Sequence, residues 1–196
     1  MNARVIEAKP VSTRHIPGEL GLWIFVLGDM LVFGLFFSVF VFYRAQNPEL
    51  FMQSQATLNS NYGALNTIFL LTSSWLVVLG INAARKNLNG LAFKLLLLAM
   101  LCGAGFISVK VIEYSEKIHA GIGLTTNDFY MFYFILTGLH FFHVLIGMVA
   151  LAVLCVIARR GISKPSDLAI LEGGASYWHM VDVLWIVLFP LLYLMK

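Results

Sequence analysis

Ionisable side chains lie inside stretches of this chain that are otherwise apolar enough to cross a bilayer. His140 and His143 are three residues apart in one stretch, and His179 and Asp182 repeat that spacing in the last one. Residues three apart share one face of a helix, so the two histidines could hold a metal ion, and His179 with Asp182 could relay a proton. An ionisable group in hydrocarbon costs roughly 3 kcal/mol or more, so each one needs a partner or a role.

Three more ionisable residues share this setting, and they widen the chemical options. With Glu113 beside them, His140 and His143 could form an iron or zinc site. Metal sites in helical bundles normally show more carboxylates in Glu-x-x-His form, so hydrogen bonding between helices is the favoured interpretation. For His179 and Asp182 a structural or lipid-binding role is favoured over a proton relay. Besides Glu113, the other two ionisable residues in these apolar stretches are Asp29 and Lys110.

Motifs for covalent, phosphate or haem chemistry are absent from the sequence. It contains no CxxC, no c-type haem motif, no phosphate-binding loop and no nucleophile elbow. There is also no basic block interleaved with aromatic residues, which disfavours a nucleic-acid partner. No constellation of these residues completes a reaction centre, so we predict no catalytic, cofactor-binding or metal-binding residues.

The elements that position these side chains are predicted to be membrane-spanning helices. The chain is 60% hydrophobic and 12% charged, with a mean hydropathy of +0.85, so its solvent is lipid. We expect an all-α integral membrane bundle forming one domain at 19–196, after a cytoplasmic tail at 1–18. Five segments have the length and polarity of spans: 20–43, 64–84, 91–115, 130–158 and 176–195.

Basic residues predict the orientation of the bundle. Connections rich in Lys and Arg alternate with poor ones along the chain, beginning with Arg4, Lys9 and Arg14 in the tail. The positive-inside rule then places the amino terminus in the cytoplasm and the carboxy terminus outside.

Depth along each helix predicts which polar groups can meet. A rise of 1.5 Å per residue from the cytoplasmic ends gives two layers. Asp29 falls in the inner layer, so we expect its hydrogen-bond partner to come from the last helix and not to be Lys110. Lys110 and Glu113, one turn apart, should pair with each other and with a histidine of the fourth helix. The inner layer contains Asp29, His179 and Asp182, and the outer layer contains His140, His143, Lys110 and Glu113.

Several motifs resemble the subunit III family of haem-copper oxidases. SYWHMVDVLW at 176–185 resembles its final helix, and LTGLHFFHVLIG at 136–147 its penultimate helix. LGDMLVFGLFF at 27–37 is similar to another family helix, where Asp29 replaces the usual glutamate. LNTIFLLTSS at 65–74 and IEYSEKI at 112–118 complete the series.

The chain resembles the short, five-helix form of that family, because the first two of the family's seven helices are missing. The segment at 110–140 is most similar to the NorE-like accessory protein of bacterial nitric oxide reductase, and next to quinol oxidase subunit III. Lys110 stands where the quinol oxidase subunit has an acidic residue.

The resemblance implies a cofactor-free, non-catalytic subunit in the bacterial inner membrane. Its partners would be the haem-bearing catalytic subunit and phospholipid, and its role would be assembly, stability and proton supply. Two alternatives remain: a stand-alone proton-coupled transporter, which should show broken helices around a mid-membrane cavity, and a membrane metalloenzyme. The residues expected to fix helix register or to hold protons or lipid headgroups are Asp29, Lys110, Glu113, His140, His143, His179 and Asp182.

Overall fold

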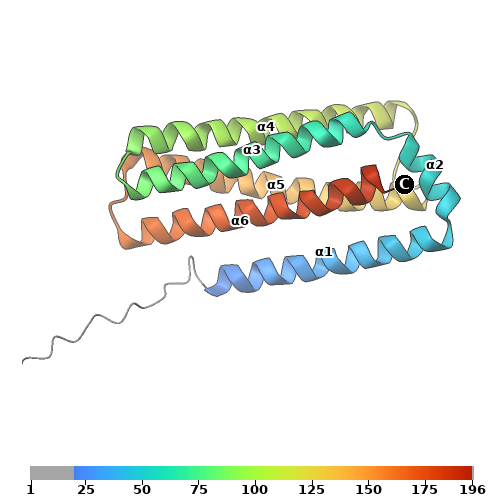
Figure 1. The fold of residues 1–196 in the computed structure, drawn as a ribbon, viewed down its shortest axis with the longest axis horizontal. Helices are drawn as coiled ribbons and strands as arrows, with labels where there is room; N and C mark the ends of the chain where they lie inside the picture. Colours follow the sequence, from blue (N-terminus) through green and yellow to red (C-terminus); the bar gives the residue numbers. More distant parts are fainter. Residues whose placement is uncertain (1–19, 196) are drawn as a thin grey trace, which may run out of the picture.

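The computed structural model describes residues 20–195, and every regular element within that range is a helix (Figure 1). Five helices are long and apolar enough to cross a membrane, which confirms the predicted all-α bundle. The predicted tail at 1–18 lies outside the described residues. The long helices are α1 (Leu20–Gln46), α3 (Ser60–Arg85), α4 (Asn89–His119), α5 (Asp128–Arg160) and α6 (Pro165–Phe189).

Two smaller elements lie at the same end of the bundle and were not predicted. The short helix α2 (Pro48–Ala56) connects α1 to α3, with its proline in the first turn. Proline suits that position because its missing N–H would be unpaired there in any case. The π-helical turn η1 (Pro190–Leu194) continues α6. Its first residue is Pro190, which has no backbone N–H to continue the hydrogen bonds of the α-helix.

Helix α6 begins eleven residues before the predicted start at 176, and a local cap explains the difference. Asp167 accepts hydrogen bonds of 3.0 Å from the backbone N–H groups of Ser163 and Lys164. It also forms an ion pair of 2.6 Å with Arg160 at the end of α5. These charges interrupt the apolar pattern, so a count of apolar residues places the start of the helix too late.

The last long helix lies inside the bundle, against α3, α5 and α1 (Figure 1). Its Trp178 is fully buried and packs where neighbouring helices carry glycine. A Cβ atom on Gly147 of α5 would lie 2.6 Å from the Trp178 ring, and one on Gly103 of α4 would lie 3.1 Å from it. Gly147 therefore lets α5 approach α6 closely, while Gly103 leaves room for the Trp178 ring to reach α4.

Helix α1 lies apart from the other four and is displaced along the bundle axis (Figure 1). Its Leu22 lies against Gly173, and its Phe25 ring stacks on Tyr177 with ring centroids 6.2 Å apart. These contacts set the start of α1 roughly 10 Å beyond the start of α6. Every residue of α1 therefore lies farther from the end of the bundle where α6 begins than its depth expected from the sequence.

Candidate functional site

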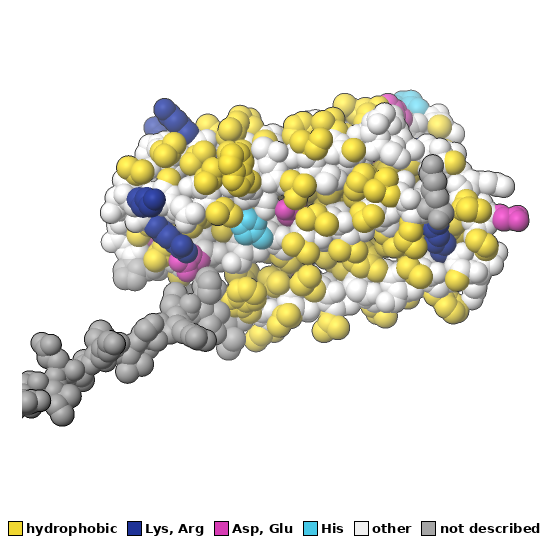
Figure 2. Space-filling view, viewed as in Figure 1, with side chains coloured by type: hydrophobic (Ala, Val, Ile, Leu, Met, Phe, Trp, Pro, Cys, Tyr) yellow, Lys and Arg dark blue, Asp and Glu magenta, His cyan; other side chains and the backbone are white. Residues whose placement is uncertain are grey.

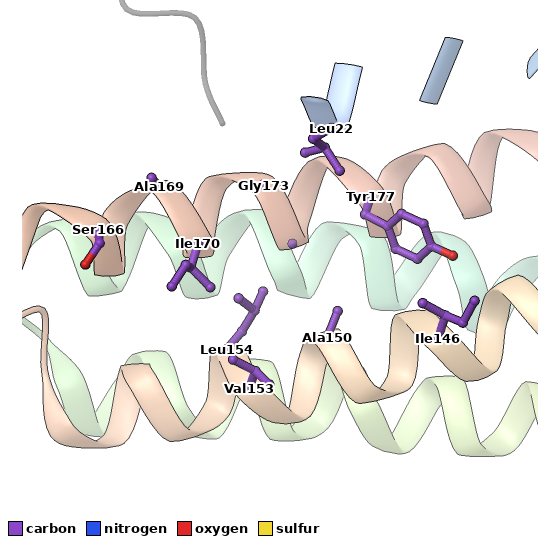
Figure 3. Close-up of a pocket in the computed structure, with 11 residues that line it drawn as sticks. Leu22, Ile146, Ala150, Val153, Leu154, Ser166, Ala169, Ile170, Gly173 and Tyr177 are labelled. Atoms are coloured by element: carbon purple, nitrogen blue, oxygen red, sulfur yellow. The ribbon is translucent and has the colours of Figure 1, made fainter. Parts of the chain in front are cut away.

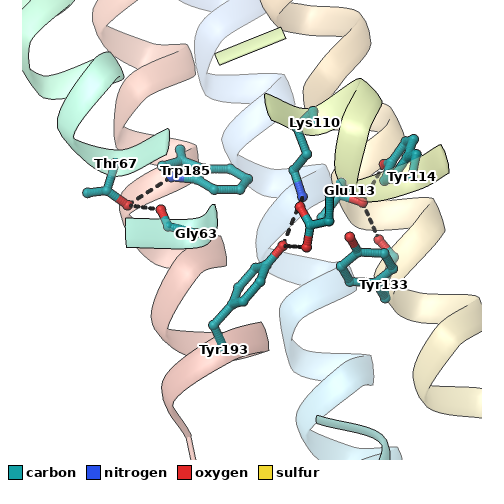
Figure 4. A network of polar contacts seen from close by, with 9 residues as sticks. Gly63, Thr67, Lys110, Glu113, Tyr114, Tyr133, Trp185 and Tyr193 are labelled. Carbon is teal, nitrogen blue, oxygen red and sulfur yellow. Dashed lines mark hydrogen bonds and ion pairs between the residues drawn. The ribbon is translucent and has the colours of Figure 1, made fainter. Parts of the chain in front are cut away.

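The most deeply buried polar cluster joins α4 to η1. The Lys110 Nζ lies 2.9 Å from the Glu113 Oε2, and the two residues are 0% and 1% exposed. Tyr193 completes the cluster, because its hydroxyl accepts from Lys110 at 2.9 Å and donates to the Glu113 Oε1 at 2.6 Å (Figure 4). The predicted Lys110–Glu113 pair is confirmed. Its expected histidine partner is wrong, since a tyrosine of the last span takes that place.

Aromatic rings surround the ammonium group of Lys110. The Nζ lies 5.1 Å from the Trp185 ring centroid and 5.2 Å from that of Tyr133, with Tyr114 and Tyr193 slightly farther away. A cation over the face of such rings is attracted by their quadrupole. The charge is thus held by one carboxylate, one hydroxyl and a ring cage, and it ties α4, α5 and α6 together.

His140 lies near this cluster but does not bond to it. Its ring packs edge-on against Phe106, with centroids 5.6 Å apart, and lies 5.2 Å from Trp185. Neither ring nitrogen has a hydrogen-bond partner among residues 20–195. In this arrangement His140 contributes aromatic packing between α4, α5 and α6.

A second polar contact ties α1 to α5. The Asp29 Oδ2 lies 3.1 Å from the His143 Nε2, and the His143 Nδ1 donates to the Leu139 backbone carbonyl at 2.8 Å. Asp29 avoids Lys110, as predicted, but its expected partner on the last helix is wrong. The displacement of α1 brings Asp29 level with His143, and Asp29 contacts α5 because His179 and Asp182 of the last helix face Ser74 of α3 instead. Asp29 and His143 therefore do not lie in separate layers.

The Asp29–His143 contact leaves both ring nitrogens of His143 with a partner. A carbonyl only accepts, so the Nδ1 donates to Leu139. The Nε2 faces the Asp29 carboxyl group, so the histidine links α1 to the backbone of α5.

His179 and Asp182 face α3 and do not meet Asp29. The His179 Nδ1 is hydrogen-bonded to the Ser74 hydroxyl, and Asp182 lies next to the same serine. Figure 2 shows histidine and acidic atoms in the middle of this otherwise largely apolar face. The predicted inner layer of Asp29, His179 and Asp182 is therefore wrong as a contact group.

Two tryptophan contacts between α6 and α3 were missed by the sequence reasoning. The Trp178 Nε1 donates to the Ser73 hydroxyl at 3.1 Å, and the Trp185 Nε1 donates to the Thr67 hydroxyl at 3.0 Å. A buried indole N–H needs an acceptor, and the hydroxyl residues of α3 were the available signal. The spacing of these residues in the sequence does not reveal which pairs will meet.

The metal and transporter alternatives receive no geometric support. His140 faces Phe106 and Trp185 whereas His143 faces Asp29, so the histidines do not converge with Glu113. Within residues 20–195, no group of three or more His, Cys, Asp or Glu side chains is placed to hold a metal ion. The spans also run unbroken through their middle, and the irregular turn η1 lies at one end.

A groove of about 510 Å³ opens between α1, α5 and α6 (Figure 3). Its walls are almost entirely apolar, with Leu22, Ile146 and Ile170 among the lining residues and Tyr177 at one end. An apolar surface of this kind suits contact with hydrocarbon chains.

The fold and these contacts define a multi-pass helical membrane protein whose ionisable groups tie its spans together. Residues 13–196 match the sequence model of cytochrome c oxidase subunit III, and the chain belongs to that family. The resemblance to subunit III of haem-copper oxidases is therefore confirmed, and with it a multi-pass protein of the bacterial membrane.

Named relatives support the same assignment. Cytochrome c oxidase subunit 3 of Synechocystis is 33% identical, over 94% of this chain and 84% of the relative. Quinol oxidase subunit 3 of Bacillus subtilis is 29% identical, over 90% and 86%. The haem-copper oxidase subunit I+III of Aeropyrum pernix is 29% identical over 96% of this chain, which spans only 25% of that longer protein.

Proposed function

We propose that this chain is the subunit III component of a haem-copper respiratory complex, bound to the haem-bearing catalytic subunit and itself free of cofactors. The observation that carries the proposal is the family match over residues 13–196. The A. pernix relative adds support, because its name places subunits I and III in one polypeptide. The contacts agree, since Lys110 bonds Glu113 and Tyr193, and Asp29 bonds His143, without forming a reaction centre.

Assembly, stability and proton supply are the proposed contributions to the complex. The Asp29–His143 contact lies within the spans, where these two groups could pass a proton to a partner's proton path. The apolar groove beside α1 supports phospholipid as a second partner, with acyl chains along Leu22 and Ile170. The orientation proposed is the one that the basic residues predict, with the amino terminus in the cytoplasm.

Two complexes could contain this chain, a terminal oxidase or a nitric oxide reductase. Quinol oxidase and cytochrome c oxidase relatives support a terminal oxidase. The alternative is an accessory role beside a nitric oxide reductase, which is favoured by the resemblance at 110–140 and by Lys110 in it.

Affinity purification of the tagged chain from its own membranes tests the proposal. We expect it to recover a haem-bearing subunit, which mass spectrometry and haem absorption spectra then assign to an oxidase or a nitric oxide reductase. Recovery of the chain alone, under several mild detergents, would contradict the proposal. Stoichiometric iron, copper or zinc on the separately expressed chain would contradict its cofactor-free state.

A further inference from the structure

Helix α1 is fixed to the bundle near its last two turns by the Phe40 cluster, formed by Phe40, Tyr43, Phe51, Phe129 and Phe132. The Phe40 ring is fully buried and packs edge-on against Phe51 of α2 and Phe132 of α5, with centroids 5.4 and 5.7 Å apart. Phe129 lies 5.7 Å from Phe51, and Tyr43 lies 5.3 Å from Phe132. Edge-to-face aromatic pairs stabilise a contact beyond the area that they bury, so this end of α1 is held firmly.

The first two turns of α1 are attached more weakly. Leu22 lies against Gly173 and the Phe25 ring stacks on Tyr177, both in α6. Helix α1 is also the least buried of the five spans, with 17% of its apolar stretch buried against 56% in the last span. Lipid chains are about as apolar as leucine, so exchanging these contacts for lipid changes the free energy little.

The Asp29–His143 contact lies between the firmly held and the weakly held parts of α1. Asp29 is about 16 Å along the helix from Phe40, and its Oδ2 lies 3.1 Å from the His143 Nε2. The Phe33 ring packs edge-on against the same imidazole, with centroids 5.6 Å apart. A carboxyl group without a partner is costly in hydrocarbon, so the polar contact favours the observed position of α1 more than its apolar neighbours do. The Asp29 side chain is 19% exposed, so a donor from outside the chain can compete for it.

The apolar groove lies beside the weakly held part of α1. Leu22 forms part of its edge, and Ile146, Ile170 and Gly173 are among the residues that line it (Figure 3). Movement of Leu22 away from Gly173 would therefore widen this groove of about 510 Å³ toward the surrounding lipid.

We propose that α1 is a hinged arm, which pivots on the Phe40 cluster and is latched closed by the Asp29–His143 contact. A rotation of about 15° moves Ile24 by roughly 6 Å, because about 24 Å of helix separates it from Phe40. The open arm admits a hydrocarbon chain to the groove from the side, and the closed arm retains it. The hinge depends on this chain alone, whereas the entry of phospholipid rests on the proposed function.

Distances between spin labels, measured by double electron–electron resonance on the full chain in lipid nanodiscs, test the arm. Labels at Ile24 of α1 and Leu101 of α4 follow the weakly held part, and labels at Phe42 of α1 and Ile118 of α4 follow the hinge end. All four side chains are exposed. Coupling the labels to a ketone-bearing unnatural amino acid leaves the native free cysteines unaltered.

Asp29→Leu removes the latch and leaves a side chain that lipid accepts. We expect it to lengthen the Ile24–Leu101 distance by at least about 5 Å, as the lever predicts, and to leave the Phe42–Ile118 distance unchanged. An unchanged Phe42–Ile118 distance also shows that the variant stays folded. Unchanged distances at both pairs would overturn the latch, and equal shifts at both would overturn the hinge.

Asp29→Asn is the matched control. The His143 Nδ1 donates to the Leu139 carbonyl, so the Nε2 of the neutral ring can accept a hydrogen bond from the asparagine amide. The arm should therefore stay closed in this variant, and a shift as large as that of Asp29→Leu would contradict the latch.

Access to the groove has its own measurement. Exchange of bound phospholipid for deuterated phosphatidylglycerol, followed by native mass spectrometry, should be faster in Asp29→Leu than in Asp29→Asn. Equal exchange rates would overturn the control of access by the arm. Copurification of the haem-bearing subunit with the unaltered chain tests the proposed function separately, so the arm and that function can fail independently.

Discussion

Replacing Lys110 by methionine should strongly destabilise the bundle. Methionine is unbranched and nearly as long as lysine, but it leaves the buried Glu113 carboxylate without its ammonium partner, although the Tyr193 hydroxyl still donates to it. Removing one member of a buried ion pair typically costs about 3–5 kcal/mol, because the other charge is left uncompensated. The exposed Lys94 of the same helix provides the control, and Lys94→Met should change the free energy of unfolding by less than about 0.5 kcal/mol.

The double variant separates a paired charge from simple packing. Removing Glu113 as well, with Glu113→Leu, eliminates the orphaned carboxylate, so the double variant should cost at least about 2 kcal/mol less than the sum of the two single variants. It will not return fully to the original stability, since the buried Tyr193 hydroxyl then lacks its bonds.

Denaturant titration in detergent micelles, followed by tryptophan fluorescence, measures these free energies. A cost below about 1 kcal/mol for Lys110→Met would refute the reasoning, because it would mean that solvent or lipid headgroups reach the carboxylate. Additive single costs would refute it too, since they would show that the two side chains act independently.

Two other substitutions test the attachment of α1 and the packing of the last helix. Asp29→Ala should cost about 1–2 kcal/mol and speed hydrogen exchange in α1 but not in α4, because it removes the contact with His143; unchanged exchange in α1 would contradict this. Gly147→Ala should cost about 1–3 kcal/mol in thermal unfolding, since its Cβ would lie 2.6 Å from Trp178. Gly34→Ala, where a Cβ meets open space, should be neutral or slightly stabilising.

The fold was largely predictable because lipid imposes a simple constraint on helices. A span must be about 20 apolar residues long, so composition alone located all five. Helix α2 was missed because nine residues of mixed polarity leave no such signal. The start of α6 was missed because a charged residue such as Asp167 is typical of a loop, although here it caps the helix.

The polar contacts were predictable only where one helix supplies both partners. Lys110 and Glu113 are three residues apart, so helix geometry alone brings them together. Tyr193 and the Asp29–His143 contact join different helices, and their meeting depends on the displacement of those helices along the bundle. Side-chain packing sets that displacement, and no periodicity in the sequence records it.

Because α6 is synthesised after the helices it joins, it controls when the bundle becomes complete. Its Trp178 and Trp185 satisfy hydroxyls of α3, and Tyr193 at the end of η1 satisfies the charges of α4. A nascent chain that stops before Pro165 lacks these indole and phenol groups, so the hydroxyls of α3 and the Lys110–Glu113 pair are left with incomplete contacts in the membrane interior. Such a fragment would display a signal by which membrane proteases distinguish an unfinished product from a finished one.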